Sequence, residues 1–189
     1  EEVLEVAELV TGQPMATLDL AAAVDRVSEL PYASEVVVER DWPGTVRVWV
    51  EVRQPVVVAL EPGGRLALLD SDGLVLEHLS REDSALPMIR VDEFGQPGSV
   101  VSRIDPLLSA ARAVPVDLGE WILALSPGGR GVRAELVGGA VVDFGLGEDY
   151  TDEMRSLATV LTRVDLRCLE SIDVSIPQNP VVVRSIAGC

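Results

Sequence analysis

The sequence has no lysine, and all 15 of its basic residues are arginines. Against 31 acidic residues, these arginines leave a formal net charge of −16. A surface this acidic repels phosphate backbones and anionic lipid head groups, so binding of nucleic acid is disfavoured. The charge is typical of a solubilising surface, and an acidic docking surface is the alternative. Aromatic residues are also scarce, at 4%, so the core must consist mainly of valine and leucine.

Motifs that carry chemistry are missing as well. The single histidine, His78, has no serine, cysteine or carboxylate at a telling spacing, which favours a surface residue over a general base. Asp70-x-Asp72-Gly73 is similar to the start of a calcium loop, but Leu74 and Arg81 replace the oxygen ligands that an EF-hand needs next. A β-turn is expected there instead. The Gly-rich run at 128–131 lies between two predicted strands and opens no helix, unlike a phosphate-binding loop. The sequence therefore predicts a protein that is not an enzyme and that has no catalytic, cofactor-binding or metal-binding residues.

Cysteine and long apolar runs give little further information. Cys168 and Cys189 form a disulfide in an oxidising compartment or remain two free thiols, and both interpretations stay open. Their spacing does not indicate a zinc site. No stretch of the chain approaches the ~18–20 consecutive apolar residues that a membrane span needs.

The three tryptophans allow two interpretations. Trp42, Trp49 and Trp121 are candidates for a sugar-stacking platform. Trp42 belongs to a turn, however, and Trp49 alternates with Val48 and Val50 along a predicted strand. Packing in the core or between domains is therefore the favoured interpretation for the tryptophans.

The first third of the chain predicts two helices followed by a β-hairpin. Apolar residues at helical spacing predict a helix over 1–10 that stops at Gly12, and a second helix over 19–30 with Thr17 or Asp19 as its cap. In 34–40 and 45–51, apolar residues recur at every second position, which is typical of half-buried strands. The segment 41–44, Asp-Trp-Pro-Gly, joins them as a turn, with Pro presetting φ and Gly tolerating a positive φ.

The rest of the chain predicts a second domain that starts near residue 58. Strands are expected over 56–61, 65–70 and 74–77, a helix over 105–114, three strands over 120–125, 132–136 and 140–144, a helix over 151–164, and a closing strand over 180–185. The predicted fold class is α+β, with domains at 1–57 and 58–189. The second domain is expected to be a mixed α+β domain, built on an antiparallel sheet with two helices.

An ordered set of motifs resembles a known family. Leu30-Pro31, a valine strand ending in Arg40-x-Trp42-Pro43, a second valine strand, and Arg53-x-Pro55-Val56 resemble the POTRA domain of the bacterial division proteins FtsQ and DivIB. Val52 departs from the pattern, because the family usually has Glu there. Further along, Ile172-Asp173-Val174 with Pro177 is close to the family's motif before its closing strand. The resemblance covers nearly the whole chain.

The resemblance implies a fold and a place in the cell. A POTRA domain of this family has the order β-α-α-β-β, so its first strand is missing from this chain and a neighbouring strand should have a bare edge. The family carries one membrane-spanning helix with a cytoplasmic tail before that strand. The chain is therefore expected to be the extracytoplasmic portion of a single-pass protein of the cell membrane at the division septum, anchored by an N-terminal helix absent here.

The resemblance also implies a partner and a binding strand. Members of the family are non-enzymatic scaffolds that link early and late division proteins, and their second domain binds the FtsB–FtsL pair (FtsB/DivIC-like and FtsL-like proteins) by strand addition to the last strand. Carried over by motif, the partner-binding positions are Ser175, Ile176, Gln178, Val181, Val182, Val183 and Arg184.

Two other functions are alternatives to a division scaffold. One is a POTRA-bearing secretion or outer-membrane assembly component that chaperones strands, although such proteins usually carry tandem POTRA repeats and no second copy of the motif occurs here. The other is an extracytoplasmic hydrolase or sugar-binding module, which needs a deep pocket with converging carboxylates and a tryptophan wall.

Overall fold

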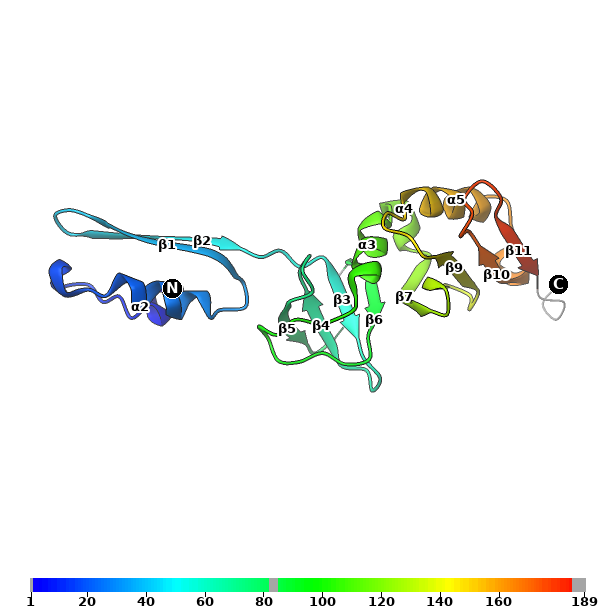
Figure 1. Ribbon diagram of the computed structural model, residues 1–189. Helices are drawn as coiled ribbons and strands as arrows, with labels where there is room; N and C mark the ends of the chain where they lie inside the picture. Colours follow the sequence, from blue (N-terminus) through cyan, green and yellow to red (C-terminus); the bar gives the residue numbers. More distant parts are fainter. Residues whose placement is uncertain (1, 82–84, 185–189) are drawn as a thin grey trace. The chain divides into compact units, whose positions relative to one another are not determined.

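The computed structural model describes residues 2–81 and 85–184, and it divides the chain into two compact units, 1–54 and 55–189 (Figure 1). Each unit has its own hydrophobic core. The first unit contains a two-stranded sheet, and the second contains a nine-stranded sheet with helices. The predicted α+β class is confirmed. Among the described residues, no helix combines the length and the apolar character needed to cross a bilayer.

The first unit places two helices against one face of a hairpin. It consists of α1 (Glu2–Val6), the short 3-10 helix η1 (Met15–Thr17), α2 (Leu20–Ser28), β1 (Ala33–Asp41) and β2 (Thr45–Val52). Asp19 caps α2, because its carboxylate accepts the backbone N–H of Ala22 at 3.1 Å. Ala23 and Val27 of α2 are fully buried, and Val36 and Val50 of the hairpin pack against them. The predicted cap and the predicted strand alternation are therefore confirmed.

At two places in this unit, arginine side chains donate hydrogen bonds to backbone carbonyl groups. The predicted helix over 1–10 ends at Val6, four residues early, and Glu8 adopts a left-handed φ of +54 just beyond it. The Arg26 guanidinium binds the carbonyls of Val6 at 3.2 Å and Ala7 at 2.6 Å. Those carbonyls are thereby satisfied without a further helical turn. Arg40, from the Arg-x-Trp-Pro motif, likewise donates to the carbonyls of Met15 and Leu18 and ties the linker between the helices to β1.

The hairpin turn differs from its prediction in one respect. β1 and β2 reverse over 42–44 as expected, and they pair in antiparallel register from Ala33 opposite Val52 to Asp41 opposite Thr45. Gly44, however, is not among the glycines with positive φ, and the Trp42–Pro43 peptide bond is cis. Within the described residues, β1 and β2 pair only with each other, so each strand has one bare edge, as expected for a POTRA domain without its first strand.

The second unit is built on one continuous sheet whose order is β11-β10-β9-β8-β7-β6-β3-β4-β5. Its first half along the chain supplies β3 (Val57–Leu60), β4 (Leu66–Leu69), β5 (Val75–Leu79) and β6 (Met88–Arg90). Its second half supplies β7 (Ile122–Gly128), β8 (Gly131–Leu136), β9 (Val141–Gly145), β10 (Leu169–Asp173) and β11 (Val181–Arg184).

The expectation of an antiparallel sheet needs correction, because the sheet is mixed. β3 with β6, β6 with β7, and β9 with β10 are parallel, while the other neighbours are antiparallel. The parallel pairs β6–β7 and β9–β10 arise where a helical crossover joins the strands, since a short hairpin cannot return the chain in the same direction. α3 (Asp105–Ala113) and the short α4 (Val116–Gly119) make one crossover, and α5 (Thr151–Leu161) with the 3-10 helix η2 (Leu166–Cys168) makes the other.

The core of the second unit lies between the sheet and helices α3 and α5. Leu107 and Leu108 of α3 and Met154 and Leu157 of α5 are buried in the same cluster as the sheet residues. The predicted turn at 70–73 is also present: the Asp70 carboxylate accepts the N–H groups of Asp72 and Leu74, both at 2.9 Å. Its oxygen is thus engaged by backbone donors, as in an Asx turn.

Gly131, at the start of β8, lies very close to the neighbouring strand β9. Its φ is +119, and a Cβ built there would lie 1.8 Å from the carbonyl oxygen of Gly145 on β9. We expect Gly131→Ala to lower the free energy of unfolding by roughly 2 kcal/mol or more, since both the backbone and the neighbouring strand must shift. Thermal melting followed by circular dichroism measures the loss, at roughly 2–4 °C per kcal/mol for a chain of this size.

Gly129, in the same hairpin, is the matched control for that variant. It has no positive φ, and a Cβ there meets nothing within 4 Å. Gly129→Ala should therefore melt like the parent protein. Equal melting temperatures for the two variants would contradict the close approach of β8 and β9.

Candidate partner-binding edge

The closing strand β11 is an end strand of the nine-stranded sheet. It pairs with β10 in antiparallel register, Ile172 opposite Val182 and Asp173 opposite Val181, with a register shift between Leu169 and Ser171. Within the described residues, no strand pairs with the other side of β11. A row of main-chain N–H and C=O groups therefore faces outward from this edge, where another strand can pair with it.

The opposite end of the sheet is covered in part by the chain itself. The segment 98–101, which follows the loop after β6, pairs with residues 73–75 at the start of β5. Val75 donates to the Ser99 carbonyl at 2.8 Å, and Gly98 donates to the Val75 carbonyl at 2.8 Å. Val101 adds a bond to the Gly73 carbonyl at 2.9 Å, and an isolated bridge joins Leu74 to Val100. Among the described residues, β5 is therefore covered at its start, whereas β11 receives no such segment on its outer side.

The side chains of β11 divide between the core and the solvent. Val182 lies in register with Ile172 and Val142 and packs against the core. Val181 and Val183 lie on the opposite, solvent-facing side, with exposed fractions of 54% and 45%. Edge strands are usually protected by shortness, charged side chains, proline or bulges. β11 is four residues long and ends in the exposed Arg184, but its other three residues are valines that carry no charge.

Three charged residues on adjacent strands form a row across the solvent-facing side of the sheet, and Val181 stands next to the last of them. Arg133, Asp143, Asp173 and Val181 stand in register on β8, β9, β10 and β11. The Arg133 guanidinium donates to the Asp143 carboxylate at 2.9 Å. The three charged residues of this row line a shallow depression of about 400 Å³ together with Arg130. Two carboxylates and two guanidinium groups meet there, so the depression has no strong preference for an ion of either sign.

The loop between β10 and β11 is anchored by Asp173 and Val174. The Asp173 carboxylate accepts the N–H of Ser175 at 2.9 Å and the Ser175 hydroxyl at 2.6 Å. These two hydrogen bonds lower the pKa of Asp173, and the charge of Arg130 lowers it further. Val174 is fully buried and donates to the Asp143 carbonyl at 2.9 Å. The start of the loop is thus tied to the sheet.

The structure places all seven predicted partner-binding positions in one continuous stretch, the loop and strand from 175 to 184. Ser175, Ile176 and Gln178 are exposed in the loop that leads into β11, and Asn179 closes a turn by donating to the Ile176 carbonyl at 2.9 Å. Sequence reasoning missed the closing segment 98–101. No strand-like alternation marks that segment, because it pairs through a few isolated main-chain bonds.

Other residues that the sequence singled out lie away from this edge. The His78 Nε2 atom is 2.9 Å from the Gly95 carbonyl oxygen, and its ring packs at a tilt against Phe94. The tryptophans were expected to pack in the core or between domains, and the core part of this expectation is wrong, since Trp42, Trp49 and Trp121 are all exposed. Among the described residues, no group of three metal-ligating side chains comes together.

The structure describes one of the two cysteines, Cys168. Cys168, at the end of η2, is disulfide-bonded. Cys189, the other cysteine of the sequence, lies outside the described residues. The question left open by the sequence is therefore decided for Cys168, which is not a free thiol.

Comparison with known families identifies the class of protein. The family model "POTRA domain, FtsQ-type" matches residues 1–53, which make up the first unit except for its last residue. The two helices and the hairpin of that unit agree with this match. The first unit therefore matches an FtsQ-type POTRA domain, and a second, mixed-sheet unit follows it.

Curated relatives extend the comparison beyond the POTRA domain. Cell division protein FtsQ of Mycolicibacterium smegmatis is 29% identical over 183 residues, covering 96% of this chain and 52% of the relative. FtsQ of Streptomyces bingchenggensis is 26% identical over 190 residues, covering 97% and 71%. FtsQ of Novosphingobium aromaticivorans is 34% identical over 123 residues, covering 62% and 38%. The chain is thus similar along nearly its whole length to proteins named FtsQ, and it spans about half the length of its M. smegmatis relative.

The lowered pKa of Asp173 makes its contribution to the stability of the folded state depend on pH. A carboxyl group with a lowered folded-state pKa stabilises the folded state above its ordinary pKa of 3.8, and this contribution is lost as the pH falls through the lower folded value. Ser175→Ala removes one of the bonds to the carboxylate, so the pKa of Asp173 should rise toward 3.8. Titration of the carboxyl carbons by NMR measures the change.

Asp149 provides an internal control for that titration. Its pKa is lowered by the same kind of contact, from the Thr151 hydroxyl and N–H. In Ser175→Ala the pKa of Asp149 should stay low, while Thr151→Ala should raise it and leave Asp173 unchanged. An unaltered Asp173 titration in Ser175→Ala would contradict the anchoring role of this serine.

Proposed function

We propose that this chain is the extracytoplasmic portion of a non-enzymatic scaffold at the division site, on the outer face of the cytoplasmic membrane. Its relatives along nearly the whole chain are named cell division protein FtsQ. Residues 1–57 act as the POTRA domain lacking its first strand, and residues 58–189 act as the FtsQ-type β domain. The full-length protein is anchored by one N-terminal membrane helix that precedes this portion.

The scaffold acts by binding other division proteins rather than by catalysis. It links early and late members of the division machinery, and the second unit binds an FtsB/DivIC-like and FtsL-like pair. The partner contributes a strand that pairs with the outer side of β11 and continues the sheet. Main-chain hydrogen bonds supply much of the affinity, and side-chain contacts select the partner.

The observation that carries this proposal is the open edge of β11. Residues 98–101 cover the start of the strand at one end of the sheet, whereas the strand with three valines at the other end has no partner on its outer side within the described residues. Val181 and Val183 offer apolar contacts to the side chains of an added strand on the solvent-facing side. Ser175, Ile176 and Gln178 extend the contact along the preceding loop, and Arg184 provides a charge at its far end.

Replacing Val182 with Pro tests the main-chain part of this proposal. Proline lacks the N–H donor and disturbs strand pairing, so Val182→Pro should weaken binding of the purified FtsB–FtsL pair from the same bacterium by about tenfold or more. Isothermal titration calorimetry measures the affinity. Because Val182 also contacts the core, circular dichroism and thermal melting must show that the second unit stays folded.

Replacing Val183 with Asp tests the side-chain part without changing the backbone. Aspartate replaces an apolar side chain that contacts the added strand, so binding should weaken by about fivefold. Val137→Asp is the matched control, because Val137 is exposed to a similar extent, 43%, outside the named strands. Unchanged affinity in a folded Val182→Pro protein, or equal losses in Val183→Asp and Val137→Asp, would overturn the proposed docking edge.

A further inference from the structure

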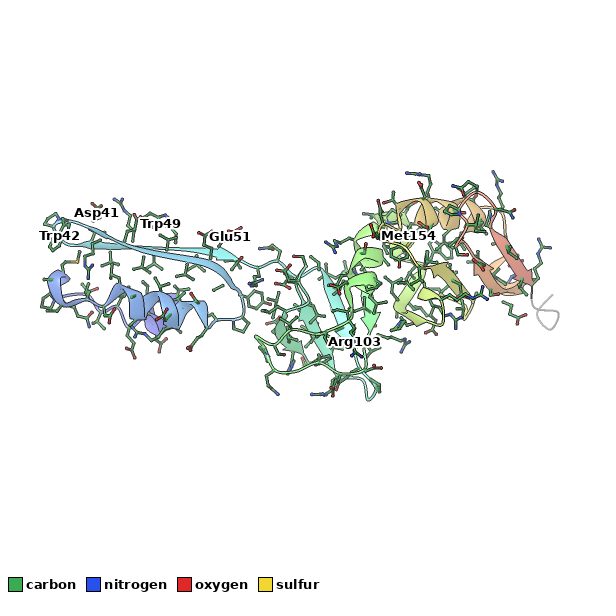
Figure 2. The ribbon with its side chains drawn as sticks, in the orientation of Figure 1. Asp41, Trp42, Trp49, Glu51, Arg103 and Met154 are labelled. Carbon is green, nitrogen blue, oxygen red and sulfur yellow. The ribbon has the colours of Figure 1, made fainter. Side chains whose placement is uncertain are left out.

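The hairpin of the first unit has a second face that the core does not use. β1 and β2 direct Val36 and Val50 toward α2, and alternate residues point the other way. Figure 2 shows Trp49 and Glu51 on the side of the hairpin away from α2. We call this surface the Trp49 face, and it consists of Glu35, Val37, Glu39, Arg47, Trp49 and Glu51.

An exposed apolar pair lies at the centre of the Trp49 face. Val37 stands directly opposite Trp49 in the antiparallel register, and their exposed fractions are 38% and 47%. A tryptophan on an open sheet face contributes nothing to the core of its own unit, whereas its large apolar surface contributes strongly to an interface. Scattered apolar residues need no explanation, but a cross-strand pair that includes tryptophan favours a docking surface.

The charges around this pair determine which partner fits. Glu35 stands directly opposite Glu51, and like charges in this arrangement destabilise a hairpin. Neither glutamate has an ion pair with another described residue. The basic residue of the face, Arg47, stands opposite Glu39 and forms an ion pair with Asp41. The face therefore presents unneutralised negative charge beside an exposed indole ring.

We propose that the Trp49 face binds an arginine- or lysine-rich segment of a partner protein. A guanidinium or ammonium group stacks over the indole of Trp49, and Trp is the aromatic side chain that attracts cations best. Neighbouring basic side chains of the segment pair with Glu35 and Glu51 and remove their mutual repulsion. The same charges repel anionic lipid and phosphate, so these are not the ligands of the face. This site is separate from the edge of β11 and does not depend on the proposed function.

A defined peptide can test this proposal with the whole chain. The probe is a terminally blocked peptide of alternating arginine and valine, added to the 15N-labelled protein, with a glutamate–valine peptide as the negative control. We expect chemical-shift changes at the indole N–H of Trp49 and the amide of Val37, and little change at the Trp121 indole. Binding should weaken with added salt, because exposed charges are screened.

Variants separate this site from general attraction to an acidic protein. Trp49→Ala should weaken peptide binding by about fivefold, as expected for a cation–π contact at an exposed site. Trp121→Ala is the matched control, with an exposed tryptophan in the second unit, and should bind like the parent protein. The double variant Glu35→Gln/Glu51→Gln should bind about tenfold more weakly, while Asp117→Asn/Glu120→Gln, which makes the same change in net charge, should have no specific effect.

A stability measurement distinguishes a binding role from a structural one. Because Glu35 and Glu51 repel each other, the double glutamine variant should melt at the same or a higher temperature while it binds more weakly. Parent-like peptide affinity in Trp49→Ala, or equal losses in the two charge-matched double variants, would overturn the proposal. Saturable binding of chitooligosaccharide or of anionic phospholipid vesicles at Trp49, in place of the basic peptide, would also overturn it.

Discussion

Unpaired backbone groups at the ends of a sheet are the constraint on which this molecule depends. Each outward N–H and C=O of an end strand needs water or another chain as its partner. In the nine-stranded sheet of the second unit, the chain satisfies part of this need at the start of β5, where residues 98–101 pair with residues 73–75. Within the described residues, β11 receives no such segment on its outer side. The two ends of the sheet therefore differ in how much of their main chain is left for another strand to pair with.

In the first unit, arginine side chains are the hydrogen-bond partners of several backbone carbonyl groups. Arg26 and Arg40 each donate from two nitrogens to two backbone carbonyls, and so hold short helical segments that have few bonds of their own. The planar fork of guanidinium suits this bridging better than an ammonium group does. This use accounts for the arginine of the Arg-x-Trp-Pro motif, which has a structural role here. The carboxylates of Glu35 and Glu51, in contrast, are left facing each other on the hairpin.

Charge is therefore not spread uniformly over this acidic chain. In the depression beside β10, the carboxylates of Asp143 and Asp173 are matched by the guanidinium groups of Arg130 and Arg133, so charge there is nearly balanced. An approaching strand meets mainly valine side chains and main-chain groups there. On the Trp49 face the negative charge is unbalanced and the apolar surface is one aromatic pair. The two surfaces thus differ in the chemistry of the partner that each can accept.

Local pattern in the sequence determined most of the helices and strands, the Asp19 cap, the Asp70 turn and the valine composition of β11, because each depends on neighbouring residues alone. It did not indicate β6, β10 or α4. Motif resemblance also pointed to the relatives that are named FtsQ. Only the tertiary structure decided that the sheet is mixed, that α1 ends at Val6 and that Trp49 is exposed. It also decided that 98–101 covers the start of β5, while β11 has no partner on its outer side among the described residues. These features depend on which distant segments meet. The periodicity of a segment shows that it has a buried face, but it does not show which segment covers that face or pairs with its edge.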